Sequence, residues 1–412
     1  MTADPVERSR LLVRDLRQLA TPAGLTAPLR GAALAEIDVI EDAYVLCVDG
    51  RIEGVGRMRE LGSLEGAVEE VDGRALAAIP GFVDCHTHAC FVGDRVEEFS
   101  LRAGGANYEE LHAAGGGILS TVRATRAASE DELREAVGRH RGWMLQAGTT
   151  TFEAKSGYGL DLDTELASLR AIAAEGGIPT YLGAHAVPRE FDDVDAYLDF
   201  ALREVLPQAA AIAEAADVFL ERGAFDAVQA RRYLEVAQSH GLALRLHADQ
   251  FSEAGGVELA IQLGARSVDH LEATGEGGVR ALAESDVVAV LLPASALFLA
   301  RPMPPARALV DAGAAVALAT DFNPGSAFCE SLPIVCSLAC TQLGLSPNEA
   351  LAACTVNAAH VLGRAGRKGC IARGYDADLV LLDAPDWRHL AYHLGGDLVA
   401  AVIQGGQVAW RR

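Results

Sequence analysis

The sequence predicts an α/β protein built on a (β/α)8 TIM-like barrel, with a small β-sandwich domain that both ends of the chain form together. Within residues 81–358, eight strand-like runs alternate with Ala-rich segments of helical periodicity. Outside this region the pattern changes to apolar runs separated by turn residues. The 412 residues exceed one ordinary core, but an α/β barrel accommodates about 250 residues as one domain.

The two ends of the chain carry the pattern of β hairpins. Residues 1–80 are expected to form the N-terminal part of the small domain and residues 359–412 its C-terminal part. Residues 44–52 place an Asp-Gly pair between two apolar runs, which is typical of a hairpin. The segments 377–383 and 398–408 are also strand-like, with a turn at a Gly-Gly pair. We therefore expect the two ends to meet in one sheet.

Residues 81–358 are expected to form the barrel. Apolar residues at three-to-four spacing predict helices between the strands, for example over 130–145 and 164–174. The Ala-rich stretch 201–216 is expected to be another helix of the outer ring. The eight strands are placed at 79–86, 149–155, 179–185, 217–221, 244–250, 267–271, 288–293 and 316–321.

Histidines and a carboxylate stand where the predicted strands end. The first strand runs into Asp-Cys-His-Thr-His, which contains His86 and His88. Residues two apart on a strand face the same way, so both imidazoles can reach one metal ion. Other strand-like runs end in His247, His270 and Asp321. Barrels place chemistry at strand ends, and such ligands around an open position are typical of catalytic zinc and also suit iron or manganese.

Each of these residues also has a structural explanation. The histidine pair by itself is equally compatible with a satisfied structural pair, and Asp321 with a helix cap. His185 follows another strand-like run and suits a metal ligand, a core histidine or a donor to a substrate carbonyl. Arg95, on the loop after the first strand, is either solvated among acidic residues or available to bind a carboxylate. Tyr158 has glycine neighbours that let its loop approach a ligand, or is a packed tyrosine.

Composition argues against several kinds of partner. The net charge is −22 and no Lys/Arg-rich run interrupts it, which disfavours nucleic acid and anionic lipid. No apolar stretch reaches the about 20 residues that span a bilayer, and the N-terminus lacks the plan of a signal peptide, so a cytoplasmic protein is expected. The eight cysteines contain no Cys-x-x-Cys pair and are expected to be small buried hydrophobes. The glycine triplet 115–117 lacks the Lys-Ser/Thr of a phosphate loop and suits a flexible active-site loop or a plain turn.

Motifs spread over the barrel region carry a family resemblance. They lie at 86–88 with 93–95, 114–118 with 120–122, 153–160, 183–185, 247–250, 269–272 and 319–326. In this order they resemble the amidohydrolase superfamily and, within it, the imidazolonepropionases. The Lys-Ser-Gly-Tyr-Gly-Leu and Asp-Phe-Asn-Pro-Gly blocks are specific to the narrower family, whereas His-x-His marks the superfamily.

The resemblance implies which residues form the site. It implies one divalent metal ion per chain, Zn²⁺ or Fe, with the ligands His86, His88, His247 and Asp321. The positions that it implies for substrate binding are Arg95, Tyr158, His185, Gln250, Asn323, Gly325 and Ser326. His270 matches a histidine beside the metal-bound water. The carboxylated lysine that bridges two metals elsewhere in the superfamily is not expected, because this family is mononuclear and Lys155 lies in its Lys-Ser-Gly-Tyr block.

The implied activity is hydrolysis of the cyclic amide bond of 4-imidazolone-5-propanoate to N-formimidoyl-L-glutamate, the third step of histidine degradation. A bound divalent metal lowers the pKa of water from 15.7 towards about 7 and so supplies hydroxide at neutral pH. Asp321, with His270 as stabiliser or alternative base, would move the proton from that water to the ring nitrogen. Arg95 and Tyr158 would hold the propanoate tail, and His185 would polarise the carbonyl together with the metal.

Two other functions stay open on the sequence. Another cyclic amidohydrolase, or a cyclic-amidine deaminase of the same superfamily, would share the metal and differ in the pocket, although Arg95, Tyr158 and Asn323 argue against it. A non-catalytic binding or metal-storage barrel would need no ordered set of polar residues around the metal. The ligands accept zinc or iron. The resemblance implies a homodimer, which no pattern in the chain allows us to derive.

Overall fold

The barrel is a parallel sheet that closes through the segments following its first and last strands. The computed structural model describes residues 9–23, 28–64, 66–105 and 117–412. The sheet has the order β13-β12-β11-β10-β9-β8-β7-β6. Beyond β6 and β13, Asp321 N donates to His86 O at 3.0 Å and His88 N donates to Phe322 O at 2.9 Å. The strands are β6 (Phe82–Asp84), β7 (Thr149–Lys155), β8 (Ile178–Ala184), β9 (Ala215–Leu220), β10 (Ala243–Ala248), β11 (Ser267–His270), β12 (Val288–Leu291) and β13 (Val316–Leu318).

The eight predicted barrel strands are confirmed, with one correction at the first. The run 79–86 is two strands in two different sheets: β5 (Ala77–Pro80) pairs with β1 and β14 of the terminal sheet, and β6 pairs with β7 of the barrel. Gly81 stands between them, where a Cβ would lie 2.3 Å from Thr150 Oγ1. Both strands are fully buried. The sequence is therefore apolar across the point where the chain passes from one sheet to the other.

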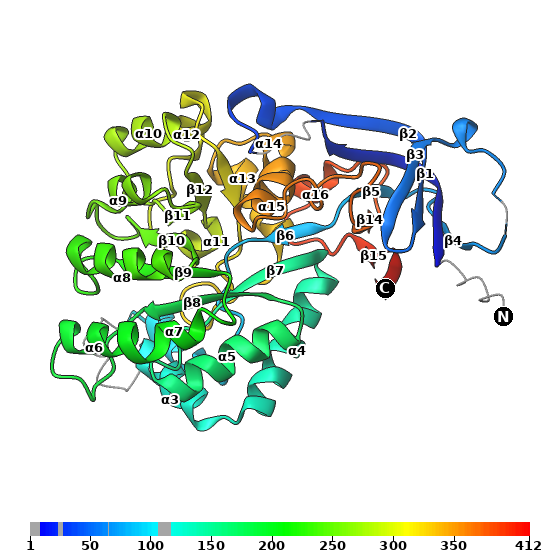
Figure 1. Ribbon diagram of the computed structural model, residues 1–412. Coiled ribbons are helices and arrows are strands. Elements are labelled where there is room, and N and C mark those ends of the chain that lie inside the picture. Colours follow the sequence, from blue (N-terminus) through cyan, green and yellow to red (C-terminus); the bar gives the residue numbers. More distant parts are fainter. Residues whose placement is uncertain (1–8, 24–27, 65, 106–116) are drawn as a thin grey trace.

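Helices cover the outside of the barrel (Figure 1). The helices predicted over 130–145 and 164–174 are confirmed as α4 and α5. The first begins at a capping box, in which Ser129 accepts from Glu132 N and the Glu132 side chain accepts in return. The helices are α1 (Val96–Ala103), α3 (Ile118–Ala127), α4 (Glu130–Gln146), α5 (Leu162–Ala174), α6 (Val194–Phe200), α7 (Leu206–Ala209), α8 (Ala227–Ser239), α9 (Gly256–Leu263), α10 (Glu276–Ala283), α11 (Pro293–Phe298), α12 (Ala306–Ala312), α13 (Leu332–Gln342), α14 (Pro347–Ala352), α15 (Ala358–Val361) and α16 (His389–Tyr392).

Two local predictions need comment. The helix expected over 201–216 ends at Ala209, after a π-helical turn η3 (Ala201–Val205) and α7. Residue 215 already begins β9, which pairs with β8 and β10. The helical propensity of alanine is therefore overridden where the barrel needs a strand. Of the glycine triplet 115–117, only Gly117 lies within the described residues, and it caps the N-terminus of α3.

The terminal β domain is built from both ends of the chain, as predicted. Its sheet has the order β16-β15-β14-β5-β1-β2-β3, with β4 beside β1, and it lies to one side of the barrel (Figure 1). The expected hairpin at residues 44–52 is the β2–β3 turn, where Asp49 and Gly50 have φ angles of 49° and 79°. The strands are β1 (Arg10–Pro22), β2 (Ile37–Val48), β3 (Arg51–Arg57), β4 (Glu69–Asp72), β5, β14 (Leu379–Leu382), β15 (Val399–Gln404) and β16 (Gln407–Arg411). The short helices are η1 (Gly31–Ala35) and η2 (Met58–Glu60).

One buried amide attaches the N-terminal part of the chain to the barrel. Asn357, in the π-helical turn η4 (Ala353–Asn357), is fully buried. Its Oδ1 accepts from Leu29 N at 2.7 Å, and its Nδ2 donates to Leu29 O at 2.9 Å and to Val316 O at 2.8 Å. The segment before β2 is thereby fixed against the end of the barrel.

All eight cysteines are free thiols, six of them buried. None of the described helices combines the length and the apolar character that crossing a bilayer requires.

We predict that Asn357→Ala lowers the free energy of unfolding by about 3 kcal/mol, because it leaves Leu29 and Val316 with unpaired buried backbone groups. Urea denaturation followed by circular dichroism measures this loss. Asn348→Ala is the matched control, since Asn348 is partly buried and makes one bond of 2.8 Å to Ala35 O. Equal losses in the two variants would show that Asn357 does not hold the segment.

Candidate functional site

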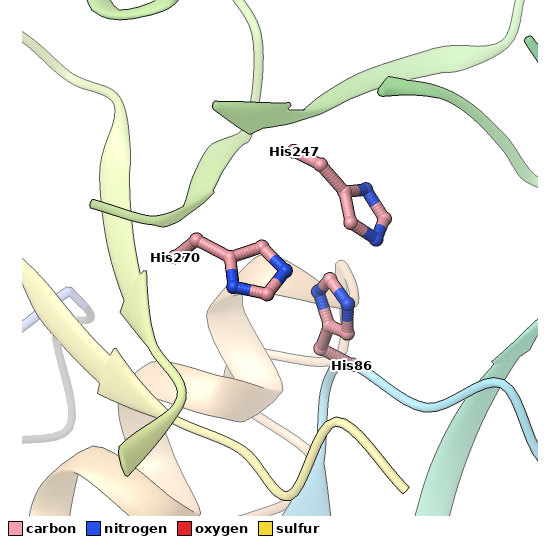
Figure 2. Close-up of side chains that lie close together, drawn as sticks. All are labelled: His86, His247 and His270. Carbon is pink, nitrogen blue, oxygen red and sulfur yellow. The ribbon is translucent and has the colours of Figure 1, made fainter. Parts of the chain in front are cut away.

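Five metal-competent side chains converge where the barrel strands end. His86 and His88 follow β6, His247 lies in β10, His270 ends β11 and Asp321 follows β13. The ligand atoms of His86, His247 and His270 lie within 4.8 Å of one another, and so do those of His86, His88 and Asp321. Figure 2 shows the three imidazoles of the first group facing one another across the strand ends. The structure thus brings together every metal ligand that the sequence implies, and His270 with them.

Two buried carboxylates orient two of these histidines. His86 Nδ1 lies 2.6 Å from Asp269 Oδ2, and His247 Nδ1 lies 3.0 Å from Asp217 Oδ1. Because a carboxylate can only accept, each Nδ1 carries a proton and each Nε2 faces the other ligands. Burial lowers the pKa of His247 to about 3, so its ring is neutral and its Nε2 offers a lone pair.

Unpaired polar atoms meet at the centre of the site. His86 Nε2 and Asp321 Oδ1 are buried without a hydrogen-bond partner among the described residues, and they lie 3.5 Å apart. His88 Nε2 lies 3.4 Å from the same Asp321 oxygen and 3.3 Å from His247 Nε2. Buried polar atoms without partners, such as His86 Nε2 and Asp321 Oδ1, are costly, and one cation could be bound by all four of these atoms. Imidazole nitrogens with one carboxylate oxygen therefore fit a divalent metal such as zinc or iron.

The electrostatics of the site also favour a positive charge. Burial alone would raise the pKa of Asp321, but the imidazoles of His86 and His88 beside its carboxylate hold that pKa well below its ordinary value. Burial and Lys155 lower the pKa of His86, yet the hydrogen bond to Asp269 and the neighbouring Asp321 carboxylate raise it overall to about 9. The carboxylates thus stabilise a positive charge at this point, which a proton or a metal ion can supply.

A buried ion network supports the orienting carboxylates. Lys155 Nζ lies 2.8 Å from Glu153 Oε1 and 2.9 Å from Asp217 Oδ2, and all three side chains are fully buried. Arg245 donates to Cys85 O at 2.8 Å and lies 3.5 Å from Glu153 Oε1. Four carboxylates and two cations belong to this connected group, namely Glu153, Asp217, Asp269, Asp321, Lys155 and Arg245. Lys155 and Arg245 offset the charges of Glu153 and Asp217, while Asp269 and Asp321 flank the ring of His86.

A cavity of about 380 Å³ opens beside these ligands. All seven residues that the sequence implies for substrate binding line it, as do four of the five metal-competent residues. The first set is Arg95, Tyr158, His185, Gln250, Asn323, Gly325 and Ser326, and the second is His88, His247, His270 and Asp321.

Arg95 is held in place at the cavity by an acid and a glycine. Its Nε donates to Glu98 Oε2 at 2.8 Å, and a second bond joins its Nη2 to the other oxygen of that carboxylate. A Cβ on Gly325 would lie 2.1 Å from Arg95 Nη1. Only glycine therefore allows the guanidinium to lie this close to the loop after β13.

The loop after β13 is bonded within itself. Asn323 Oδ1 accepts from Gly325 N at 2.8 Å and from Ser326 N at 2.7 Å, while its Nδ2 donates to Asp321 O at 2.6 Å. These bonds hold Asp321 at a φ of 56°, a left-handed conformation that non-glycine residues rarely adopt. The alternative that Asp321 caps a helix is not seen, because Ser331 caps the following helix α13.

His185 has a defined orientation. Its Nδ1 lies 2.9 Å from Gly157 O, and because a carbonyl can only accept, Nδ1 carries the proton. Burial lowers the pKa of His185 well below its ordinary value, so the ring is neutral and Nε2 is a hydrogen-bond acceptor. The ring stacks on His88 with 5.3 Å between centroids. This geometry favours acceptance of an N–H group from a ligand in place of the expected donation to a carbonyl.

Sequence reasoning missed several residues of the site. Asp217 and Asp269 were given no role, although a charged residue inside an otherwise apolar central strand needs a buried partner, and that signal was available. Arg102 also lines the cavity, with its guanidinium carbon 4.8 Å from the Phe298 ring centre and its Nη1 3.4 Å from Gly325 O. No motif pointed to Arg102, since Phe298 and Gly325 come from distant parts of the chain.

Known proteins match this chain along most of its length. The sequence profile described as the Amidohydrolase family matches residues 77–409. The imidazolonepropionase of Rubrobacter xylanophilus is 60% identical over 406 residues, which are 96% of this chain and 97% of the relative. That of Chloroflexus aggregans is 47% identical over 422 residues, or 98% and 99% of the two chains.

Solved structures share the fold at lower identity. A zinc-bound adenosine deaminase from Xanthomonas campestris superposes with a TM-score of 0.70 at 19% identity, over 97% of this chain and 92% of the other. A guanine deaminase from C. acetobutylicum gives 0.73 at 16% identity, over 98% and 100% of the chains. Since the profile and the nearly full-length relatives agree, the chain belongs to the amidohydrolase family and, within it, to the imidazolonepropionases.

Proposed function

We propose that this protein hydrolyses 4-imidazolone-5-propanoate to N-formimidoyl-L-glutamate. The observation that carries the proposal is the cavity, in which convergent metal-competent side chains lie beside Arg95, Tyr158 and His185. This set suits a flat ring with an N–H group and an anionic tail. The names of the relatives at up to 60% identity support the same reaction.

We propose that His86, His88, His247 and Asp321 hold one divalent ion, zinc or iron. When bound, such an ion acts as a Lewis acid and makes water a nucleophile near neutral pH. The carboxylate of Asp321 takes a proton from the attacking water and passes it to the ring nitrogen as the amide C–N bond breaks. His270, whose Nδ1 lies 3.4 Å from Glu272 Oε1, stabilises this transfer or acts as the alternative base.

The substrate is oriented by the wall of the cavity opposite the reacting bond. The guanidinium of Arg95, fixed by Glu98, pairs with the propanoate carboxylate, and the phenol of Tyr158 donates to the same group. His185 Nε2 accepts the ring N–H. Gln250, Asn323, Gly325 and Ser326 complete the wall, with Asn323 and Ser326 acting through the loop that they bond together.

The proposal extends to the setting of the enzyme. We propose a homodimer of chains in the cytoplasm, each divided into residues 1–80, 81–358 and 359–412. Eight free thiols suit a reducing compartment. Sedimentation velocity of the purified protein measures the oligomeric state.

Asp321→Asn is predicted to abolish turnover, because an amide neither accepts the proton nor supplies an anionic ligand. The measurement follows the loss of ultraviolet absorbance of freshly generated 4-imidazolone-5-propanoate in the presence of zinc or iron. Rapid loss with the parent protein and none with the variant is the expected result. If the parent protein contains metal but leaves this compound intact, the proposed substrate is wrong, and cyclic amidines and other lactams become the candidates.

Metal removal is predicted to stop turnover, and addition of zinc or ferrous iron after the chelator is removed to restore it. Metal analysis of two histidine variants then distinguishes a metal ligand, His247, from a residue that assists proton transfer, His270. His247→Asn should lower the metal content well below one ion per chain, whereas His270→Asn should keep the ion and lose most activity. Equal loss of metal in both variants would make His270 a ligand.

Arg95→Lys is predicted to raise KM for the imidazolone by about 10-fold or more while kcat changes little, because lysine lacks the bidentate fork and the bond to Glu98. Steady-state kinetics on the absorbance change measures both constants. Arg139→Lys, an arginine on helix α4 away from the cavity, is the control and should leave both constants unchanged. A KM in Arg95→Lys equal to that of the parent would show that the propanoate tail of the substrate does not bind at Arg95.

A further inference from the structure

A buried carboxylate outside the catalytic groups holds the loop that carries Tyr158. Glu165 lies in α5, just after that loop, and is fully buried. Its Oε1 accepts from Gly157 N at 3.0 Å, from Gly159 N at 2.8 Å and from Leu160 N at 2.8 Å, and its Oε2 accepts from Gly157 N at 3.0 Å. Hydrogen bonds to an ionised carboxylate are about twice as strong as neutral ones.

The loop cannot hold this shape by local preference alone. Leu160 has a φ of 56° and Gly157 a φ of 97°, both in the left-handed region. A Cβ on Gly159 would lie 2.7 Å from Glu165 N, and one on Gly157 would lie 2.7 Å from Leu182 O. The chain is therefore drawn tightly around the carboxylate, and the bonds to Glu165 offset the backbone strain.

Two side chains of the cavity depend on this arrangement. Tyr158 stands between the bonded amides of Gly157 and Gly159, so the backbone from which its ring projects is fixed on both sides. Gly157 O accepts the Nδ1 proton of His185, which sets the direction of the His185 Nε2 atom. The two rings lie 5.4 Å apart, and both line the cavity.

We infer that Glu165 is a positioning residue for the hydrolysis proposed above, on which this inference rests. Its carboxylate fixes the loop at residues 156–160 and thereby places the Tyr158 phenol and the His185 imidazole against the substrate. Glu165 itself does not line the cavity and touches no reacting atom.

The test compares Glu165→Gln with the parent protein. Glutamine keeps the size and one acceptor oxygen, but its NH2 group faces the Gly157 N–H, so two donors oppose each other. Glu349→Gln is the matched control. Glu349 is also a buried acid, with 6% exposure, that accepts a backbone N–H, from Ser346 at 2.7 Å, and it lies away from the cavity.

Hydrogen exchange tests the positioning without any substrate. The amides of Gly157, Gly159 and Leu160 are expected to exchange at least 10-fold faster in Glu165→Gln than in the parent or in Glu349→Gln, with the barrel strands unchanged. Unchanged exchange in this loop overturns the inference.

Kinetics then test the consequence for the reaction. Glu165→Gln is expected to lower kcat/KM by about 10- to 100-fold, since a small misplacement of binding groups costs that much, while Glu349→Gln stays within about twofold. Tyr158→Phe should lower kcat/KM by a smaller factor in the Glu165→Gln variant than in the parent, because both substitutions remove the contact of the Tyr158 phenol with the substrate. A metal content equal to that of the parent separates this effect from loss of the metal.

The outcomes separate this inference from the proposed function. Faster loop exchange with parent-like kcat/KM, or strictly additive effects of the two substitutions, overturns the role of Glu165 in positioning. A parent protein inactive on the imidazolone overturns the proposed function, and loop exchange alone then decides whether Glu165 fixes the loop.

Discussion

The structure of the site depends on the hydrogen bonds from His86 to Asp269 and from His247 to Asp217. These carboxylates are completely buried, and burying a charge in a dry core is costly unless it is paired. Lys155 and Arg245 offset part of that cost from within the barrel. In return, the carboxylates fix which nitrogen of each imidazole faces the centre, so the ligands are arranged before any metal arrives. The interior of the barrel is thus a polar scaffold for the ligands as well as a hydrophobic core.

Barrel closure provides the second constraint. The backbone bonds that join the first and last strands run between residues 86–88 and 321–322, the segments that carry three of the proposed ligands. The first and last strands of the barrel, β6 and β13, are therefore joined at the site. His270 and Asp321 adopt left-handed φ angles of 83° and 56°, which a free chain would avoid. At Asp321 such strain persists because barrel closure and the bond from Asn323 hold the backbone there.

The sequence predicted the parts of this architecture that depend on local patterns. Strands alternate with helices visibly, and several histidines and Asp321 stand at strand ends, which indicated a metal site. The family resemblance then implied which of them are ligands, namely His86, His88, His247 and Asp321. The break at Gly81 could not be predicted, because both flanking strands are buried and equally apolar. The orientation of His185 depends on a carbonyl 28 residues away, a contact that no periodicity encodes.

The cavity is lined both by strand ends and by loops. The metal-competent residues lie on or beside barrel strands, whereas the residues facing the substrate lie on loops that acids tie down through backbone N–H groups. Glu98 accepts from Gly117 N at 2.7 Å, Glu165 from the loop after β7, and Glu221 from Phe251 N at 2.8 Å. Each acid bonds a different loop, and side-chain contacts such as His185 Nδ1 with Gly157 O join neighbouring loops. The fold is shared with solved structures at under 20% identity, and a shared barrel does not define a reaction. The residues that line the cavity, and not the barrel itself, must therefore decide which ring is bound.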